Sequence, residues 1–256
     1  MSTSTALARA EFTLLVRNRV LLFNALVMPL LFPVAFLFIG RENGSLPDAT
    51  VSSALEVFAL FLLVFLVYYN LLSAYATRRD ELVLKRLRTG EATDNEILLG
   101  PAIPSFALTT VLTIVVAAFV IALGGSLPVN PVLLIAALGG GAAMFAALAL
   151  ITSTFTRNAE AAQITSMPVI LLAMAGTSFM RSIAPDSLGT VIELTPFAAV
   201  LDLVDLGWIG RTDPAAAPLS FAETFSESTT PLLVTTAWIV GSIVIAKTHF
   251  RWEPRA

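Results

Sequence analysis

The run Leu55–Tyr75, LEVFALFLLVFLVYYNLLSAY, contains a single charged side chain, Glu56. A helix needs about 20 consecutive apolar residues to cross the hydrocarbon core of a bilayer. This run therefore predicts a membrane-spanning helix. It is followed by the segment Arg78–Gly100, RRDELVLKRLRTGEATDNEILLG, which holds ten charged residues. The chain is expected to leave the membrane there and to expose this segment to water.

The whole chain has the composition of a membrane protein. Of its 256 residues, 57% are hydrophobic and 13% are charged, whereas a soluble domain carries about 25% charged residues. We predict an all-α integral membrane protein, one domain over residues 1–256, with six transmembrane helices. The expected spans are Val20–Ile39, Leu55–Tyr75, Ile103–Leu123, Val132–Phe155, Ala161–Met180 and Pro231–Lys247.

The positive charges predict the orientation of these spans. With both termini in the cytoplasm, 12 of the 15 lysines and arginines lie on the cytoplasmic side, and only Arg41, Arg181 and Arg211 lie outside. Positive charge marks the cytoplasmic side of membrane helices. We therefore expect both termini and the segment Arg78–Gly100 to be cytoplasmic.

The N-terminal residues 4–18 carry leucines at helical spacing together with Arg9 and Arg17. This pattern is typical of an amphipathic helix that lies in the membrane interface, although a simple basic flank to the first span has the same composition. A signal peptide is not expected, because the first apolar run is too long and lacks a clean cleavage site. Cysteine is absent, which excludes disulfides and thiolate metal sites.

Residues 181–230 are expected to form a re-entrant or broken helix pair followed by an outer loop. Leu188–Ile209 is apolar enough to suggest another span, but it contains Glu193, Pro196, Asp202 and Asp205. Each aspartate costs about 2.5–3.5 kcal/mol at the centre of a membrane helix. A broken helix places these groups without a full crossing.

The charged segment has local signals of its own. Asp80–Arg88 is helical in pattern, and Gly90 is expected to end that helix in a left-handed conformation. Thr93 and Glu96 have the spacing of a capping box, which predicts a second helix leading into the third span. The sequence therefore predicts helix, tight break and helix, with some of the leucines packed inward and others available to a partner.

Several polar side chains lie near membrane depth. Asn24 and Asn70 are expected either to hydrogen-bond a neighbouring helix or to line a substrate path. Tyr68 and Tyr69 are typical of an interfacial aromatic belt, and they lie beside Asn70. We include Asn24, Tyr68, Tyr69, Asn70 and Glu193 as candidate substrate-path residues.

The sequence lacks the residues of common catalytic sites. It has no Gly-x-x-x-x-Gly-Lys-Ser/Thr phosphate-binding loop, and His249 is its only histidine. The chain is therefore not expected to be an ATPase itself or to bind a metal or cofactor. No nucleic-acid partner is expected.

The chain resembles the permease subunits of ABC transporters of the class that exports drugs and polysaccharides, including actinobacterial antibiotic exporters. The resemblance lies in the basic N-terminus, the order of six spans, the phrase LKRLRTGEATDNEILLG and the broken stretch around Glu193–Pro196. It implies that Arg78–Gly100 is a cytoplasmic coupling segment that docks into a separate ATPase subunit, where ATP and Mg²⁺ bind. It also implies that residues 4–18 form the interfacial connecting helix. The docking residues implied by the resemblance are Glu81, Leu82, Leu84, Lys85, Arg86, Leu87 and Arg88, with Thr89 and Gly90 as the turn.

The resemblance further implies two permeases, identical or related, with two ATPase subunits in the plasma membrane of a bacterium. The apolar spans favour export of a hydrophobic or amphipathic small molecule such as an antibiotic. A lipid or polysaccharide exporter of the same class is an alternative. A membrane scaffold or sensor subunit that transports nothing is a second alternative, and it would need no ATPase.

Overall fold

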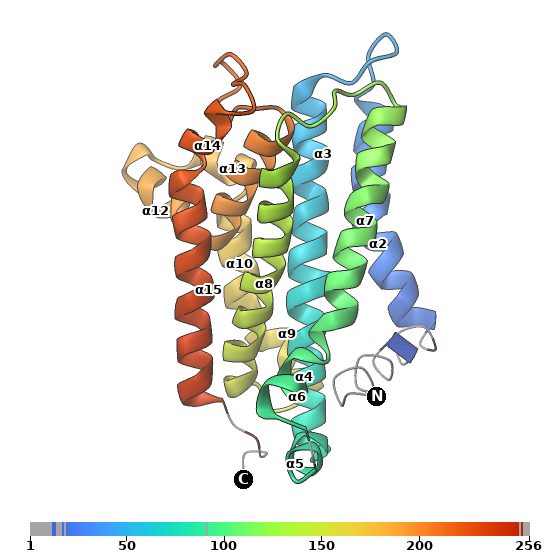
Figure 1. The fold of residues 1–256 in the computed structure, drawn as a ribbon, viewed down its shortest axis with the longest axis vertical. Coiled ribbons are helices and arrows are strands. Elements are labelled where there is room, and N and C mark those ends of the chain that lie inside the picture. The colour runs from blue at the N-terminus through green and yellow to red at the C-terminus, as the bar shows by residue number, and fades with distance from the viewer. Residues whose placement is uncertain (1–11, 14–16, 18, 91, 251, 253–256) are drawn as a thin grey trace.

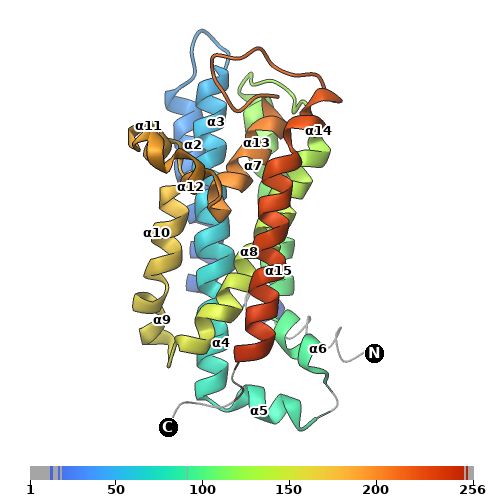
Figure 2. The same ribbon diagram turned by 90° about the vertical axis from the view of Figure 1, so that its left-hand side faces the viewer.

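In the computed structural model the chain is an all-helical bundle, and residues 12–13, 17, 19–90, 92–250 and 252 are described. Figures 1 and 2 show the long helices side by side, with short helices gathered at both ends. The predicted interfacial helix of residues 4–18 falls almost wholly outside the described residues.

The described elements are α2 (Arg19–Ile39), α3 (Asp48–Leu60), the π-helix η1 (Phe61–Tyr69), α4 (Asn70–Asp80), α5 (Val83–Arg88), α6 (Asp94–Leu99), α7 (Ala102–Ala122), α8 (Pro131–Phe155), α9 (Ala159–Thr165), α10 (Met167–Ala175), α11 (Ser178–Ile183), the 3₁₀ turn η2 (Asp186–Leu188), α12 (Gly189–Glu193), α13 (Pro196–Trp208), α14 (Glu223–Glu227) and α15 (Thr229–His249).

Four helices of the described chain are long and apolar enough to cross a membrane: Asp48–Asp80, Ala102–Ala122, Pro131–Phe155 and Thr229–His249. The bent pair Asp186–Glu193 and Pro196–Trp208 raises the number to five if it counts as one span. The first and fifth predicted spans correspond to shorter apolar helices, Ala25–Ile39 and Ala159–Ala175. By length and composition, the described residues thus give four or five candidate spans where the sequence predicts six.

The predicted broken helix pair is confirmed. The two arms meet at an angle of 81°. Thr195 has extended backbone torsions and Pro196 is at the start of α13, because a residue before proline avoids the helical region and proline fits the first helical turn. The last span also differs in detail from its prediction: α15 begins at Thr229, ahead of the expected Pro231.

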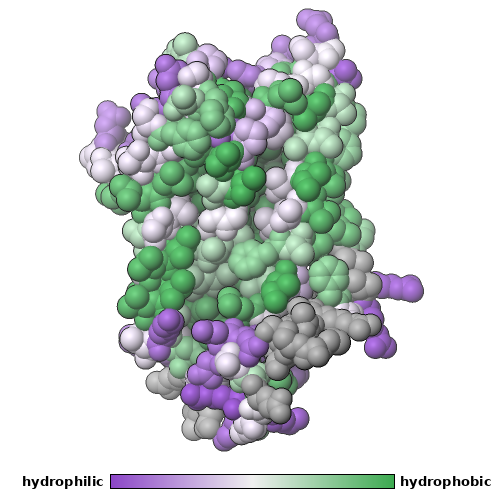
Figure 3. Space-filling model, in the orientation of Figure 1, coloured by the Kyte–Doolittle hydropathy of each residue, from purple (hydrophilic) through white to green (hydrophobic). Residues whose placement is uncertain are grey.

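The helix α8 lies at the centre of the bundle, packed against α15, α13, α4, η1 and α7. Tyr68, Phe145 and Phe197 are fully buried and form edge-to-face contacts across this centre, with ring centroids 6.4 and 6.5 Å apart. Away from the centre, large apolar side chains are exposed along α2, α7 and α15. Figure 3 shows apolar side chains over the middle of one face and polar ones at its two ends, as expected for a bundle surrounded by lipid.

The start of α2, the end of α15 and α5 lie at one end of the bundle, which we call the α5 end (Figure 1). The loops after α2 and α7 and the segment from α13 to α14 lie at the other end, which we call the far end.

Glycines let the helices approach closely at the centre. A Cβ atom on Gly207 of α13 would lie 2.9 Å from the backbone nitrogen of Leu134 in α8. By contrast, a Cβ atom on Gly139 of α8 would meet nothing within 4 Å.

We therefore expect Gly207→Ala to destabilise the protein by about 1–3 kcal/mol, because the α8 backbone must shift to admit a methyl group. Thermal unfolding in detergent measures the change. Gly139→Ala is the matched control and is expected to be neutral or slightly stabilising, because alanine favours a helix more than glycine does. Equal unfolding temperatures for the two variants would contradict this packing.

Candidate functional site

The charged segment after the second span forms two short helices joined by a turn. The chain leaves α4 at Asp80, and Leu82 adopts a left-handed conformation with φ of 59° before α5 begins. The predicted helix from Asp80 is therefore shorter than expected and starts at Val83. Gly90 is not among the residues with positive φ, so the left-handed turn predicted after the helix is instead found before it, at a leucine. Such a conformation is uncommon for leucine and marks a sharp change of chain direction.

The second half of the segment agrees with its prediction. The Thr93 hydroxyl accepts from the Glu96 backbone nitrogen at 3.4 Å, and the Glu96 carboxylate accepts from the Thr93 backbone nitrogen at 2.9 Å. This capping box starts α6. The segment also contains an ion pair between Arg88 and Asp94 at 3.1 Å, and Tyr75 donates to the carbonyl of Leu98 at 2.7 Å. These contacts give the segment a defined shape against the end of α4.

The predicted docking residues divide into buried and exposed groups. Leu84 is fully buried, so it packs inside the chain and anchors α5 to the bundle. Leu87 is half-buried. Leu82 is 41% exposed although it is apolar. The exposed members of the predicted set are Glu81, Leu82, Lys85, Arg86, Arg88, Thr89 and Gly90. The exposed face is therefore mainly basic, with one apolar side chain at its edge.

A groove lies within the apolar part of the bundle, between α2 and the helix formed by η1 and α4. It has a volume of about 440 Å³ and is lined by Ala25, Met28, Pro29, Phe61, Phe65, Leu66, Tyr69, Asn70 and Ser73. The π-helix η1 forms part of its wall. Such wide helical turns occur frequently at functional sites. The groove thus combines mostly apolar walls with a few polar groups from Tyr69, Asn70 and Ser73.

The candidate substrate-path residues are not all brought together. Tyr69 and Asn70 line this groove, whereas Tyr68 is buried and donates to the Thr152 hydroxyl at 3.2 Å. Glu193 lies instead in a separate cleft of about 310 Å³ beside α11 and α13. The side chain of Asn24 lies outside the described part of the chain.

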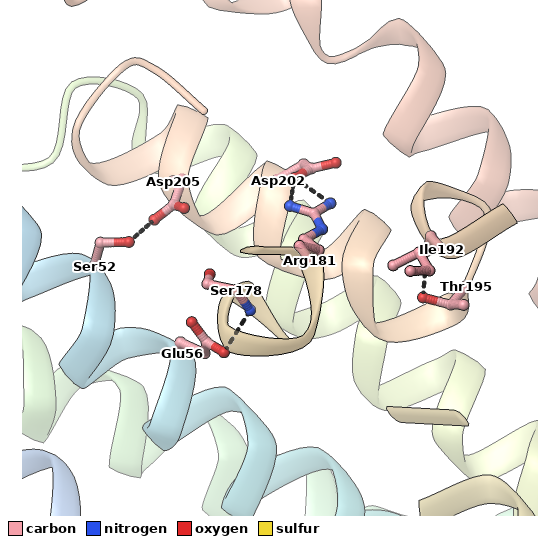
Figure 4. Close-up of polar contacts among 8 residues, drawn as sticks. All are labelled: Ser52, Glu56, Ser178, Arg181, Ile192, Thr195, Asp202 and Asp205. Atoms are coloured by element: carbon pink, nitrogen blue, oxygen red, sulfur yellow. Dashed lines mark hydrogen bonds and ion pairs between the residues drawn. The ribbon is translucent and has the colours of Figure 1, made fainter. Parts of the chain in front are cut away.

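One polar face of α3 holds the elements of the far end in place, as Figure 4 shows for two of its residues. Ser52 donates to the Asp205 carboxylate at 2.7 Å, and the Glu56 carboxylate accepts from the backbone nitrogen of Ser178 at 2.9 Å. One turn earlier on the same helix, Asp48 pairs with Arg211 at 2.6 Å. Residues four apart share a helix face. The spacing of Asp48, Ser52 and Glu56 in the sequence therefore indicates one polar face, but it does not indicate which residues that face contacts.

The same region contains an ion pair that sequence reasoning missed. Arg181 of α11 donates to one oxygen of Asp202 of α13 at 2.7 and 2.8 Å (Figure 4). Asp202 is one of the acidic residues whose cost in lipid made a further full span in Leu188–Ile209 unfavourable, and Arg181 pairs with its charge.

A family model described as ABC-2 family transporter protein matches residues 38–246. The chain belongs to this family. It is therefore the membrane-spanning permease of an ABC-2 type transporter, and a permease domain of this family carries no ATPase site and binds no cofactor of its own. Among the residues that the structure describes, no group of three or more His, Cys, Asp or Glu side chains is arranged to hold a metal ion. A comparison with curated proteins gives no match.

An ABC-2 permease implies a separate ATPase subunit as its partner.

Proposed function

We propose that this permease exports a hydrophobic or amphipathic small molecule, such as an antibiotic, across the plasma membrane of a bacterium. The groove between α2 and the η1–α4 helix is the observation that carries this proposal. Its volume of about 440 Å³ falls in the range of about 300–1,000 Å³ that is typical of sites for drug-sized ligands.

The chemistry of the groove supports an apolar cargo. Phe61 and Phe65 stack with ring centroids 5.4 Å apart, and Phe61 also stacks on Phe32 of α2 at 5.1 Å. Tyr69, Asn70 and Ser73 add hydroxyl and amide groups, and no charged side chain lines the groove within the described residues. Such walls suit a molecule with a large apolar part and few hydrogen-bonding groups, and they do not suit a small ion.

The energy for export comes, in this proposal, from an ATPase subunit that docks on α5. Lys85, Arg86 and Arg88 give the exposed face a positive charge, and Leu82 offers an apolar contact beside them. The partner surface is therefore expected to be a cleft with acidic side chains at its rim and an apolar patch for Leu82. Leu84 contributes by holding α5 in place from the buried side.

We further propose six crossings, with α2 and the α9–α10 pair as the two that are shorter in the described residues. Both termini and α5 are then cytoplasmic, because 12 of the 15 lysines and arginines fall on that side. The working unit in this proposal contains two permeases and two ATPase subunits.

The cargo path is tested with Met28→Trp, which places a larger side chain in the groove. We expect efflux to fall by about tenfold or more, because pockets of this kind discriminate strongly on volume. A drug-susceptibility panel measures the loss in cells that express the permease with its ATPase. Leu31→Trp is the matched control: Leu31 is an exposed side chain on the same helix and does not line the groove. If both variants protect cells as the native protein does, the groove is not the path.

The docking face is tested with Leu82→Asp and Arg86→Glu. Both positions are exposed, and aspartate tolerates the left-handed conformation at position 82 better than most residues do. Each change is expected to weaken binding of the ATPase by about 2 kcal/mol if it removes a central contact of the interface. Co-purification through the permease measures binding. Asn95→Asp on the exposed part of α6 is the control, and recovery of the ATPase with all three variants would exclude α5 as the docking helix.

The orientation is tested with single cysteines, because the native chain contains none. Thr212→Cys in the loop at the far end is expected to react with a membrane-impermeant maleimide in intact cells. Thr89→Cys at the α5 end is expected to react only after the cells are opened. The reverse pattern would invert the topology.

A further inference from the structure

Arg79 is a buried arginine between the proposed docking helix and the bundle. It lies in the last turn of α4, three residues before the left-handed Leu82, and is only 2% exposed. Arginine is among the residues least often buried, and a buried one is normally held by acceptors. Arg79 is the second residue of the charged segment Arg78–Gly100.

Two of its acceptors are carbonyl groups at the end of α8, one from Ser153 in the last turn of the helix and one from Thr156 directly after it. The Nη1 atom donates to the carbonyl of Ser153 at 2.7 Å, and Nη2 donates to the carbonyl of Thr156. Both acceptor residues are fully buried. The Ser153 carbonyl also accepts from the backbone nitrogen of Thr156 at 3.2 Å, and the carbonyl groups at the end of a helix carry the negative end of its dipole. A guanidinium group bridges two of them at once because its donors form a rigid fork.

The contact joins α4 to the central helix of the bundle. Tyr68, three turns earlier on the same continuous helix, donates to Thr152 of α8 at 3.2 Å. The continuous helix formed by η1 and α4 is therefore hydrogen-bonded to the α8 region at two places, and the one at Arg79 is closer to α5. The helix α8 also packs against α13 and α15. A displacement at the end of α4 would therefore move α8 and, through it, these two helices.

We propose that Arg79 is a positioning residue of the transport cycle, which makes the end of α8 follow the end of α4 when the ATPase moves α5. This inference rests on the proposed docking at α5. It assigns Arg79 no contact with cargo or with the ATPase. Its substitution should therefore uncouple transport from ATP hydrolysis and leave the docking face unchanged.

The experiment compares Arg79→Gln and Arg79→Lys with the native protein in vesicles that contain the permease and its ATPase. We expect the ATPase to remain bound and ATP hydrolysis to continue, while cargo moved per ATP hydrolysed falls at least tenfold for Arg79→Gln. Arg79→Lys should be intermediate, because an ammonium group keeps the charge and loses the fork. Arg78→Gln, the neighbouring arginine in the same turn, is the matched control.

A purely structural role would lower transport and hydrolysis together, in proportion to the amount of folded complex. That result, or a native transport-to-hydrolysis ratio in Arg79→Gln, would overturn the proposal. Failure of the docking assignment is a different outcome, because it appears as retained binding in Leu82→Asp and Arg86→Glu.

A second measurement follows movement of the end of α8 directly. Phe155→Cys at the exposed end of α8 reports movement of that end in a background with native Arg79. Its rate of maleimide labelling is expected to change when a non-hydrolysable ATP analogue binds the complex, and Arg79→Lys is expected to reduce this change. A labelling rate that is indifferent to the nucleotide would overturn the proposal.

Discussion

Every helix end and every break in this bundle needs a hydrogen-bonding partner, because hydrocarbon offers none to the backbone. The central helix α8 is satisfied at both ends. At its start, Asn130 accepts from the backbone nitrogens of Val132 and Leu133 at 3.1 and 3.2 Å. At its end, Arg79 donates to the carbonyls of Ser153 and Thr156. Removing Asn130 or Arg79 would take these hydrogen bonds away, and each buried polar group left unpaired costs about 1–3 kcal/mol. The packing of the surrounding helices depends on α8 remaining intact between these two caps.

The same constraint explains how the far end contains broken helices. The backbone nitrogen at the start of α11 is bonded by Glu56, and the bend between α12 and α13 is held by Trp238 of α15, whose indole donates to the Leu194 carbonyl at 2.9 Å. Asp202 and Asp205 are each bonded to a side chain from another element. Charged groups are therefore compatible with this position because each has a partner.

The local features of this fold were predictable from sequence, and the long-range pairings were not. The capping box at Thr93 is confirmed, because it depends on residues three apart. The cost of Asp202 and Asp205 in lipid correctly indicated a broken helix. Their partners Arg181 and Ser52 are 21 and 153 residues away, and no pattern in one sequence relates such positions. The turn at Leu82 was missed because leucine carries no turn signal, whereas Gly90 nearby does.

The groove and the proposed docking helix belong to one continuous stretch of chain. The helix Asp48–Asp80 contributes Phe61, Phe65, Tyr69 and Asn70 to the groove wall, and it ends one residue after Arg79. Its π-helical section lies at the groove, and such sections occur frequently at functional sites. A force applied at α5 would reach the groove along this helix, and it would reach α8 through Arg79. A cargo in the groove would therefore experience movement of this wall relative to α2, which packs on the same helix through the stack of Phe32 on Phe61.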